Sequence, residues 1–370
     1  MRAARQRHAR LYPAPMRLIF CWTKEVIWWI SRMSTLFPRS LVDSAAVAAL
    51  LQEHWRMQLG PLLKRSQNTT FSAHDAAGKQ FAVRATPDDG GSGGDAVYAR
   101  ICDELLFVSF VSNAGCPGVC APVPPLAGAH CNGALRCHGV VLCVFEWAQG
   151  APVDFGAYRW MTDEGVVNAI GAWLGCCHTA SMEFAAAHPD VCARMRPWWA
   201  LHERLMEGAE VAAEDACDMP ADGICNNHWG VLHGDCNVSN FHLVSAADSA
   251  ASLSVFDWDQ TCCGWWELDL AQTALACTML AEGGALPSGD AVPVADPAAF
   301  KRWLLAGYDS VRGQGAADGG RFDRLLQQRK VFYSRFCVRA REEGDIPADM
   351  EWFIEYVLRW IARAPLHANQ

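Results

Sequence analysis

Two short stretches of the sequence combine residue types that could move a proton and hold a metal ion. His233-Gly234-Asp235 is followed by Asn240, and Asp257-Trp258-Asp259 comes further along the chain. Phosphoryl transfer from a nucleotide needs one carboxylate to accept the proton of the attacking hydroxyl, and an amide oxygen with a second carboxylate to hold Mg²⁺. Proton abstraction by an aspartate would contribute about 10²–10⁴-fold to such a reaction. The two stretches therefore favour phosphoryl transfer.

The residues between these stretches indicate how the polar groups would be brought together. Phe241–Val244 and Leu253–Phe256 are short apolar runs separated by an Ala/Ser-rich turn. Such runs on either side of a turn predict a small hairpin. The hairpin would present Asp235 and Asn240 before its first strand and Asp257 after its second.

The order of these motifs resembles the aminoglycoside phosphotransferase/choline kinase superfamily, whose members have a protein-kinase-like fold. The resemblance implies that Asp235 is the catalytic base and that Asn240 and Asp257 are magnesium ligands. Asp259 is a further candidate ligand but a weaker one than Asp257, because the corresponding position is not acidic in all such families. The resemblance also implies structural roles for His233, in the catalytic loop, and for Asp269, which opens a helix.

Segments in the first half of the chain resemble the nucleotide site of that superfamily. The run that contains Thr69 and Thr70 resembles the first strand and the small loop over the nucleotide phosphates. Arg84 stands where the family has a strand residue that contacts phosphate, a lysine in protein kinases. Glu104 resembles the ion-pair partner of that residue on the following helix, with Asp103 as a rival for the same role.

The resemblance extends to the connection between the two halves of the chain. Phe145-Glu146-Trp147 resembles the hinge whose backbone meets adenine, so these three residues are candidate nucleotide contacts. Asn237 could either cap a turn or line the site. Trp265 and Trp266 could stack on a substrate or hold a cation, although tryptophans in such positions more often pack in a core.

The pattern along the chain predicts an α+β protein in two lobes. We expect a helix over Ser44–Met57, then a hairpin formed by Asn68–Ala73 and Gln80–Ala85. Further predicted elements are a helix over Ala96–Ser112, a strand over Gly139–Glu146, and helices over Thr162–Ala180, Pro197–Glu214, Asp269–Glu282, Pro297–Arg312, Phe322–Glu343 and Ala348–Arg363.

These elements and the resemblance together predict the domain organisation. Residues 1–40 form a basic N-terminal extension, either disordered or the product of a start assigned too early. Residues 41–147 form a nucleotide-binding N-terminal lobe, an antiparallel sheet with a helix. Residues 148–370 form a mainly helical C-terminal lobe with the catalytic and magnesium residues and the acceptor site.

Composition excludes several classes of protein. The 370 residues are 51% hydrophobic, which is too apolar for a disordered chain. The net charge of −9 argues against nucleic acid as the main partner. The 17 cysteines include no C-x-x-C pair, which indicates reduced thiols in an intracellular, cytoplasmic protein. The Cys and His residues between 116 and 143 have no standard zinc spacing.

The first 32 residues carry seven basic side chains and one acid, and three interpretations remain open. The segment could target an organelle, or it could anchor at a membrane interface through Trp22, Trp28 and Trp29. We favour the third interpretation, in which Met33 is the true start. Neither apolar run in this segment reaches the ~20 residues that span a bilayer.

We therefore expect a phosphotransferase that uses ATP and Mg²⁺ to phosphorylate a hydroxyl of a small, amine-bearing acceptor. Two alternatives remain. The first is a Ser/Thr protein kinase of the same fold, although the ten residues between Asp259 and Asp269 leave little room for an activation segment. The second is a catalytically silent protein that binds nucleotide and regulates a partner. We expect no nucleic-acid partner and no integral membrane segment.

Overall fold

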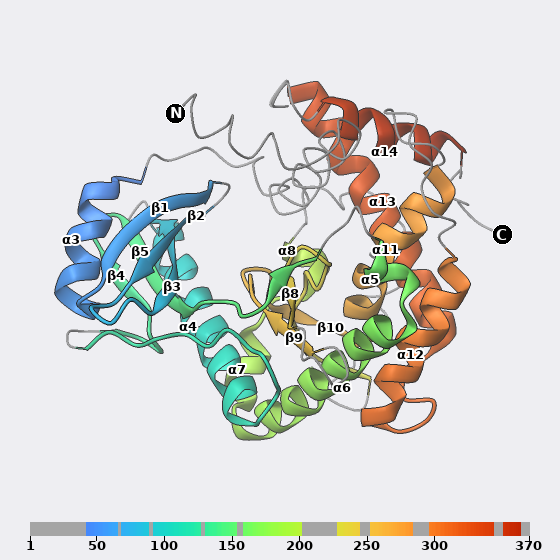
Figure 1. The fold of residues 1–370 in the computed structure, drawn as a ribbon, viewed down its shortest axis with the longest axis horizontal. Helices are drawn as coiled ribbons and strands as arrows, with labels where there is room; N and C mark the ends of the chain where they lie inside the picture. Colours follow the sequence, from blue (N-terminus) through green and yellow to red (C-terminus); the bar gives the residue numbers. More distant parts are fainter. Residues whose placement is uncertain are drawn as a thin grey trace.

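The computed structural model describes residues 42–65, 68–88, 92–126, 130–153, 158–201, 228–244, 252–283, 296–343 and 351–363. The predicted extension, residues 1–40, lies outside this part of the chain. So does most of the predicted helix Pro197–Glu214, of which the structure describes α8 (Trp198–Leu201). Figure 1 shows a sheet-containing lobe (blue and teal) beside a mainly helical lobe (green to red).

The N-terminal lobe is built on a five-stranded antiparallel sheet with the strand order β1-β2-β3-β5-β4. Its strands are β1 (Gln58–Arg65), β2 (Thr69–His74), β3 (Gln80–Pro87), β4 (Leu135–Cys137) and β5 (Val140–Glu146). The predicted hairpin corresponds to β2 and β3, and the turn between them contains Gly78 with a φ of 82°. The predicted Val-rich strand corresponds to β5.

The prediction that the run containing Thr69 and Thr70 forms the first strand was wrong. β1 precedes it and was not predicted from the sequence. Pro61 lies inside β1 and cannot donate to a sheet ladder, so the run does not resemble a strand. The structure accommodates the proline because β1 is the edge strand and its pairing with β2 is irregular on both sides of Leu62.

Helices cover both faces of this sheet. The first, α3 (Ser44–Trp55), begins where the Asp43 carboxylate accepts a hydrogen bond from the Ala45 amide, and it packs its apolar side on Val83 and Val144. The second, α4 (Ser92–Asn113), packs on the other face. Because side chains alternate along a strand, Arg84 points to the α4 face of the sheet.

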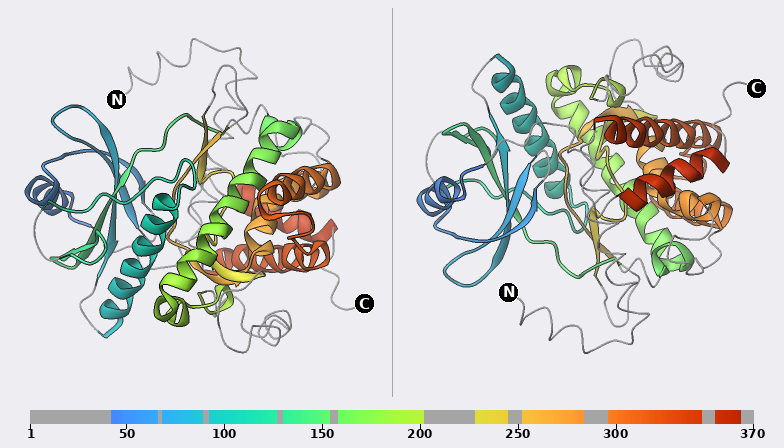
Figure 2. Two further views of the ribbon diagram at one scale, coloured as in Figure 1. Left: turned by 90° about the horizontal axis from the view of Figure 1, so that it is seen from below. Right: turned by 90° about the horizontal axis from the view of Figure 1, so that it is seen from above.

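The helical lobe holds the largest apolar core. Its helices are α5 (Arg159–Thr162), α6 (Glu164–Ala187), α7 (Pro189–Arg194), α8, α11 (Glu267–Gly283), α12 (Pro297–Arg312), α13 (Gly319–Glu343) and α14 (Glu351–Arg363). Figure 2 shows α6 (green) along the side of this lobe that faces the N-terminal lobe. Glycines permit close packing of α6 and α12, because a Cβ at Gly171 or Gly307 would overlap backbone oxygen of the opposite helix.

Two small sheets lie between the lobes and present the candidate site. One pairs β7 (Trp229–Leu232) with β10 (Cys262–Trp265), and the other has the order β6-β8-β9. Its strands are β6 (Ala151–Pro152), β8 (Phe241–Val244) and β9 (Ser252–Val255). The predicted hairpin around the polar groups corresponds to β8 and β9. Strands β7 and β10 were not predicted from the sequence. Each has four residues, and the two strands pair although about thirty residues separate them in the chain.

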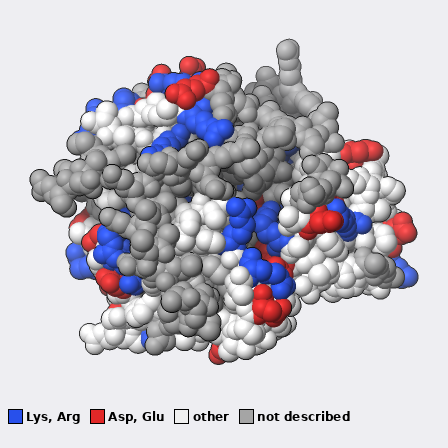
Figure 3. Space-filling model, turned by 180° about the vertical axis from the view of Figure 1, so that it is seen from behind, with Lys and Arg blue, Asp and Glu red and all other residues white. Residues whose placement is uncertain are grey.

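These observations confirm the α+β, two-lobed, protein-kinase-like architecture. In the part of the chain that the structure describes, no helix combines the length and the apolar character that a bilayer crossing needs. On the face drawn in Figure 3, acidic side chains lie next to basic ones in the described part.

Candidate active site

The candidate catalytic loop begins directly after β7 with a sharp turn at Gly234. This glycine has a φ of 81°, and a Cβ at this position would overlap the carbonyl oxygen of Gln260. Only glycine therefore fits here without strain. His233 is fully buried, and its ring lies 4.5 Å from the ring of Trp258, centroid to centroid. Its two nitrogens contact the Asp235 amide and the Phe256 carbonyl, which joins the loop to the end of β9.

The carboxylate of Asp269 anchors this loop through two backbone hydrogen bonds. It is fully buried at the start of α11, and it accepts hydrogen bonds from the amides of His233 and Gly234, both at 2.9 Å. Burial by itself would raise the pKa of Asp269, but the contact with His178 and the backbone amides outweigh it and lower that pKa. The structural role implied for Asp269 fits this arrangement.

His178 of α6 connects this anchor to α12. One ring nitrogen lies 3.3 Å from the Asp269 carboxylate and the other lies 3.0 Å from the hydroxyl of Tyr308. The imidazole also stacks on Trp266 at 4.6 Å. Burial lowers the pKa of His178, although Asp269 opposes that shift.

We expect the folded protein to lose stability as the pH falls from 7.5 to 5.5, partly through His178. The unfolded chain takes up a proton at the ordinary histidine pKa of 6.5. The folded chain does not, so its stability is complete above that pH and declines below it. One such histidine gives a slope approaching about 1.4 kcal/mol per pH unit. Urea unfolding of the wild type and of His178→Gln at several pH values measures this slope.

Two other histidines with a lowered pKa, the buried His233 and the half-buried His242, are present in both proteins. The difference between the two slopes therefore reports His178 alone. Parallel curves for wild type and His178→Gln would show that His178 does not contribute to the pH dependence.

The carboxylate of Asp235 is the centre of a network of amide donors. Its Oδ1 accepts from Asn237 at 2.9 Å and from Gln272 at 2.7 Å, and its Oδ2 accepts from Asn240 at 3.0 Å. Burial raises the pKa of Asp235 to about 7, against the opposing effects of Asn237 and Arg329. A carboxylate oriented in this way near neutrality is suited to accepting a proton.

Three residues of this network carry no motif, and the sequence analysis missed them. Gln272 lies one turn into α11 and also donates to the Tyr333 hydroxyl of α13 at 3.0 Å. Arg329 of α13 is 3% exposed and donates to the Gly234 carbonyl at 2.8 Å. Arg329 also lies over the ring of Trp198. Arg329 is one of several basic residues in α13, and nothing in the sequence distinguishes it from the others.

Asn240 and Asp257 lie side by side at the end of the β8–β9 hairpin. The Phe256 amide donates to the Asn240 carbonyl at 3.0 Å, which places Asp257 next to the asparagine. Asp257 has a φ of 66°, a left-handed conformation that is common in strained functional segments. Burial would raise the pKa of Asp257, but the hydrogen bond and charge of Lys64, together with the charges of Arg84 and His233, lower it.

The donor set of these two residues fits Mg²⁺. Both offer hard oxygen ligands, and Mg²⁺ typically takes one or two carboxylates and fills its remaining positions with water and phosphate. Among the residues that the structure describes, no cluster of three or more His, Cys, Asp or Glu could hold a metal ion. A metal ion that takes its remaining ligands from nucleotide phosphates and water does not need such a cluster. The zinc cluster considered between residues 116 and 143 is likewise absent from the described residues.

Two residues of the N-terminal lobe reach the acids of this segment. The Lys64 ammonium lies 3.0 Å from Asp257 Oδ2, and the Asn68 amide donates to Asp259 Oδ2 at 2.8 Å. Asp259 therefore lies at the boundary between the lobes, where its backbone carbonyl also accepts from Arg100. Its role as a further metal ligand stays a prediction.

Arg84 and Glu104 form a buried ion pair. The two terminal nitrogens of Arg84 lie 2.8 Å and 3.0 Å from the two carboxylate oxygens, and the side chains are 7% and 2% exposed. The rival candidate Asp103 instead pairs with Arg194 of α7 at 2.7 Å. The geometry thus joins Arg84 to Glu104, and the role of this pair at the nucleotide stays a prediction.

The other predicted nucleotide contacts lie on the same lobe. Thr69 is buried in β2, whereas Thr70 is half-buried and pairs with Arg84 across the sheet. At the hinge, the Phe145 ring lies beneath the Arg84 guanidinium, and the Glu146 amide already donates to Ala121. An adenine contact at the hinge would therefore need other backbone groups of this segment.

The tryptophans considered as substrate contacts lie in the core. Trp266 is fully buried against His178, and Trp265 is 6% exposed at the end of β10 beneath the Arg321 guanidinium. Trp265 is the last residue of β10, and Trp266 directly precedes α11. Of the two roles weighed for these tryptophans, the placement favours packing.

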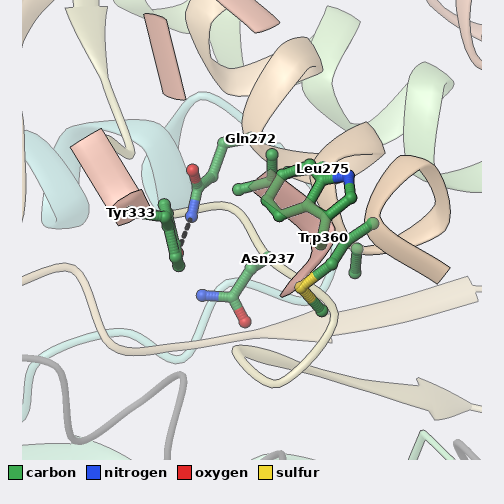
Figure 4. Close-up of a pocket in the computed structure, with 7 residues that line it drawn as sticks. Asn237, Gln272, Leu275, Tyr333 and Trp360 are labelled. Atoms are coloured by element: carbon green, nitrogen blue, oxygen red, sulfur yellow. Dashed lines mark hydrogen bonds between the residues drawn. The ribbon is translucent and has the colours of Figure 1, made fainter. Parts of the chain in front are cut away.

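A small cavity in the helical lobe is lined in part by Asn237 and Gln272, two of the residues that donate hydrogen bonds to Asp235. Asn237, Gln272, Leu275, Tyr333 and Trp360 line it, together with Ala276 and Met279. Figure 4 shows the Gln272 amide directed at the Tyr333 hydroxyl, with the Trp360 indole across the space. The Trp360 indole nitrogen donates to Glu282, whose carboxylate is neutralised by Lys330 at 2.8 Å.

Comparison with solved structures finds proteins of similar fold. A complex of amicoumacin kinase with AMP-PNP, Ca²⁺ and Ami matches with a TM-score of 0.63 and 16% identity, over 89% of this chain and 96% of that chain. A mutant of aminoglycoside 2′-phosphotransferase-IIIa in complex with GDP matches with a TM-score of 0.50 and 12% identity, over 87% and 99%. No protein-family model and no curated protein matches the sequence. The chain has the fold of the aminoglycoside phosphotransferase/choline kinase superfamily.

Proposed function

We propose that this chain, whose fold is that of small-molecule kinases, transfers the γ-phosphoryl group of ATP to a hydroxyl of a small acceptor. The observation that carries the proposal is the Asp235 carboxylate. It is oriented by three amide donors, two of which, Asn237 and Gln272, line a small cavity, and the candidate magnesium ligands Asn240 and Asp257 belong to the same segment. The fold similarity to a kinase solved with AMP-PNP and Ca²⁺ supports a nucleotide and a divalent metal as cofactors.

The hydrogen bonds of Asp235 suggest which of its oxygens takes the proton. A carboxylate oxygen has two lone pairs, and Oδ1 already accepts two hydrogen bonds. Oδ2 accepts one side-chain hydrogen bond, from Asn240, so a lone pair remains for the acceptor hydroxyl. We propose that Oδ2 accepts the hydroxyl proton as the oxygen attacks the γ-phosphorus, with ADP as the leaving group.

The remaining residues would position the reactants. Asn240 and Asp257 would hold the metal ion, which neutralises phosphate charge when it is bound. Arg84, with Glu104 behind it, would face the phosphates from the sheet. Asn237 and Gln272 would keep the Asp235 carboxylate in one orientation, and Arg329 would hold the loop through the Gly234 carbonyl.

The small cavity lined by Asn237 and Gln272, two donors to Asp235, is the basis of our proposal for the acceptor. None of its described lining residues is charged, and the aromatic rings of Tyr333 and Trp360 form part of its wall. An ammonium group binds well against such rings. We therefore propose an alcohol with a single amine, or with an apolar body, because a polycation would meet no carboxylate among these lining residues.

We expect acceptor-dependent release of ADP when the full chain is given Mg²⁺, ATP and a panel of hydroxylated amines and apolar alcohols. GTP is tested beside ATP, because one structural neighbour was solved with GDP. Nuclear magnetic resonance of the product identifies the new phosphate ester. Nucleotide binding without acceptor-dependent release of ADP, for every acceptor in the panel, would contradict the proposal.

The same assay, extended with protein substrates, separates the two alternatives. Phosphorylation of a protein substrate, without any small acceptor, would establish a protein kinase. Nucleotide binding without transfer to either class would establish a regulatory protein. None of the described cysteines forms a disulfide bond, and we propose a cytoplasmic location.

A further inference from the structure

The sheet of the N-terminal lobe carries two basic residues in one row. Strand pairing places Lys64 of β1 opposite Thr70 of β2, and Thr70 opposite Arg84 of β3. Residues that are directly opposite on neighbouring strands point to the same face of a sheet. Lys64 and Arg84 therefore point to the same face, the one that lies against the candidate metal segment.

The two cations have different surroundings. Arg84 is enclosed, because Glu104 engages both of its terminal nitrogens and the Phe145 ring covers it. Lys64 is more open, with its side chain 19% exposed, and its ion pair reaches Asp257 at 3.0 Å. Asp257 is itself 24% exposed. A negatively charged ligand that enters between the lobes would reach Lys64 more readily than Arg84.

Lys64 and a divalent ion would compete for the same carboxylate. The ammonium contacts Asp257 Oδ2, an oxygen that a metal held by Asp257 would approach. Like charges at such short distances repel strongly. A lysine ammonium displaced from Asp257 would pair with another anion. A phosphate oxygen is a suitable partner, because an ammonium group binds phosphate well as a point charge.

We propose that Lys64 is a phosphate ligand of the nucleotide site, and that it competes with the metal ion for Asp257. This inference rests on the proposed function. Metal and nucleotide arriving together would move the Lys64 ammonium from the carboxylate to a phosphate oxygen. Lys64 would thus weaken binding of the free metal ion and strengthen binding of the metal–nucleotide complex.

The test uses Lys64→Met in the full chain and two binding measurements that need no turnover. Free Mn²⁺, measured by electron paramagnetic resonance, reports binding of the metal alone. Fluorescence of a methylanthraniloyl ATP analogue with Mg²⁺ reports binding of the nucleotide complex. We expect the affinity for Mn²⁺ to rise about tenfold and the affinity for the nucleotide to fall about tenfold, the size of one charge-assisted contact.

Three further variants make the result specific. Lys64→Gln is expected to repeat both changes, whereas Lys64→Arg keeps the charge and is expected to keep both affinities within about threefold. Lys301→Met is the matched control, because Lys301 of α12 is 26% exposed and pairs with Asp323 at 2.6 Å, away from the site. It should change neither affinity.

Only a rise in Mn²⁺ affinity together with a fall in nucleotide affinity agrees with the proposal, and the reverse pair of changes overturns it. A fall in both, a rise in both, or no change in either overturns it. A wild type that binds the nucleotide while Lys64→Met binds it equally well overturns the role of Lys64 alone. A wild type that binds no nucleotide overturns the proposed function, and this inference with it.

Discussion

Replacing Asp235 with asparagine is expected to reduce phosphoryl transfer by about 10²–10⁴-fold. The variant keeps the shape of the side chain but removes the group that would accept the hydroxyl proton. Metal and nucleotide contacts do not pass through this carboxylate in the proposed site, so nucleotide affinity should stay within about threefold. Acceptor-dependent ADP release measures the rate, and the fluorescent ATP analogue measures the affinity.

The surroundings of Asp235 call for a stability control. The asparagine amide would face at least one of the three amide donors that now point at the carboxylate. The melting temperature of Asp235→Asn is therefore measured beside its activity. Asp323→Asn makes the same chemical change at the distant ion pair with Lys301 and should keep full activity. Wild-type turnover by a folded Asp235→Asn protein would exclude Asp235 as the base.

Replacing Asp269 with alanine is expected to lower the free energy of unfolding by about 3–5 kcal/mol. The change leaves the buried amides of His233 and Gly234 without an acceptor, and it leaves His178 without its carboxylate partner. Each buried donor that loses its partner costs about 1–3 kcal/mol. Urea unfolding at pH 7.5 measures the loss.

A second aspartate provides the comparison for this effect. Asp323→Ala removes an aspartate whose side chain is 63% exposed, and exposed ion pairs contribute only about 0–1 kcal/mol. We expect its unfolding free energy to stay within that range. If Asp269→Ala were no less stable than Asp323→Ala, the catalytic loop would not depend on the Asp269 anchor.

Elements that depend on neighbouring residues were predictable from the sequence. Strands β8 and β9 are short apolar runs on either side of a turn, and α12 has the predicted bounds Pro297–Arg312. The spacing of Asp235, Asn240 and Asp257 around that hairpin was visible for the same reason. Periodicity and turn residues act over a few positions, so they can be read locally.

Strands whose partners are distant were not predictable in the same way. β1 contains Pro61 and has a partly exposed pattern, and only its place at the sheet edge makes it a strand. β7 and β10 are four residues each and exist as strands because they pair with one another. Their short runs resemble parts of other elements until the chain has folded.

The sequence by itself determined the types and the order of the groups that could carry the reaction, because these groups lie in two compact motifs. Tertiary packing alone decided which other side chains join them. Gln272 and Arg329 reach the catalytic loop from α11 and α13, and Lys64 reaches Asp257 from the other lobe. A single polar residue in a helix or an edge strand has no local signature, so its partner is set only by how the elements pack.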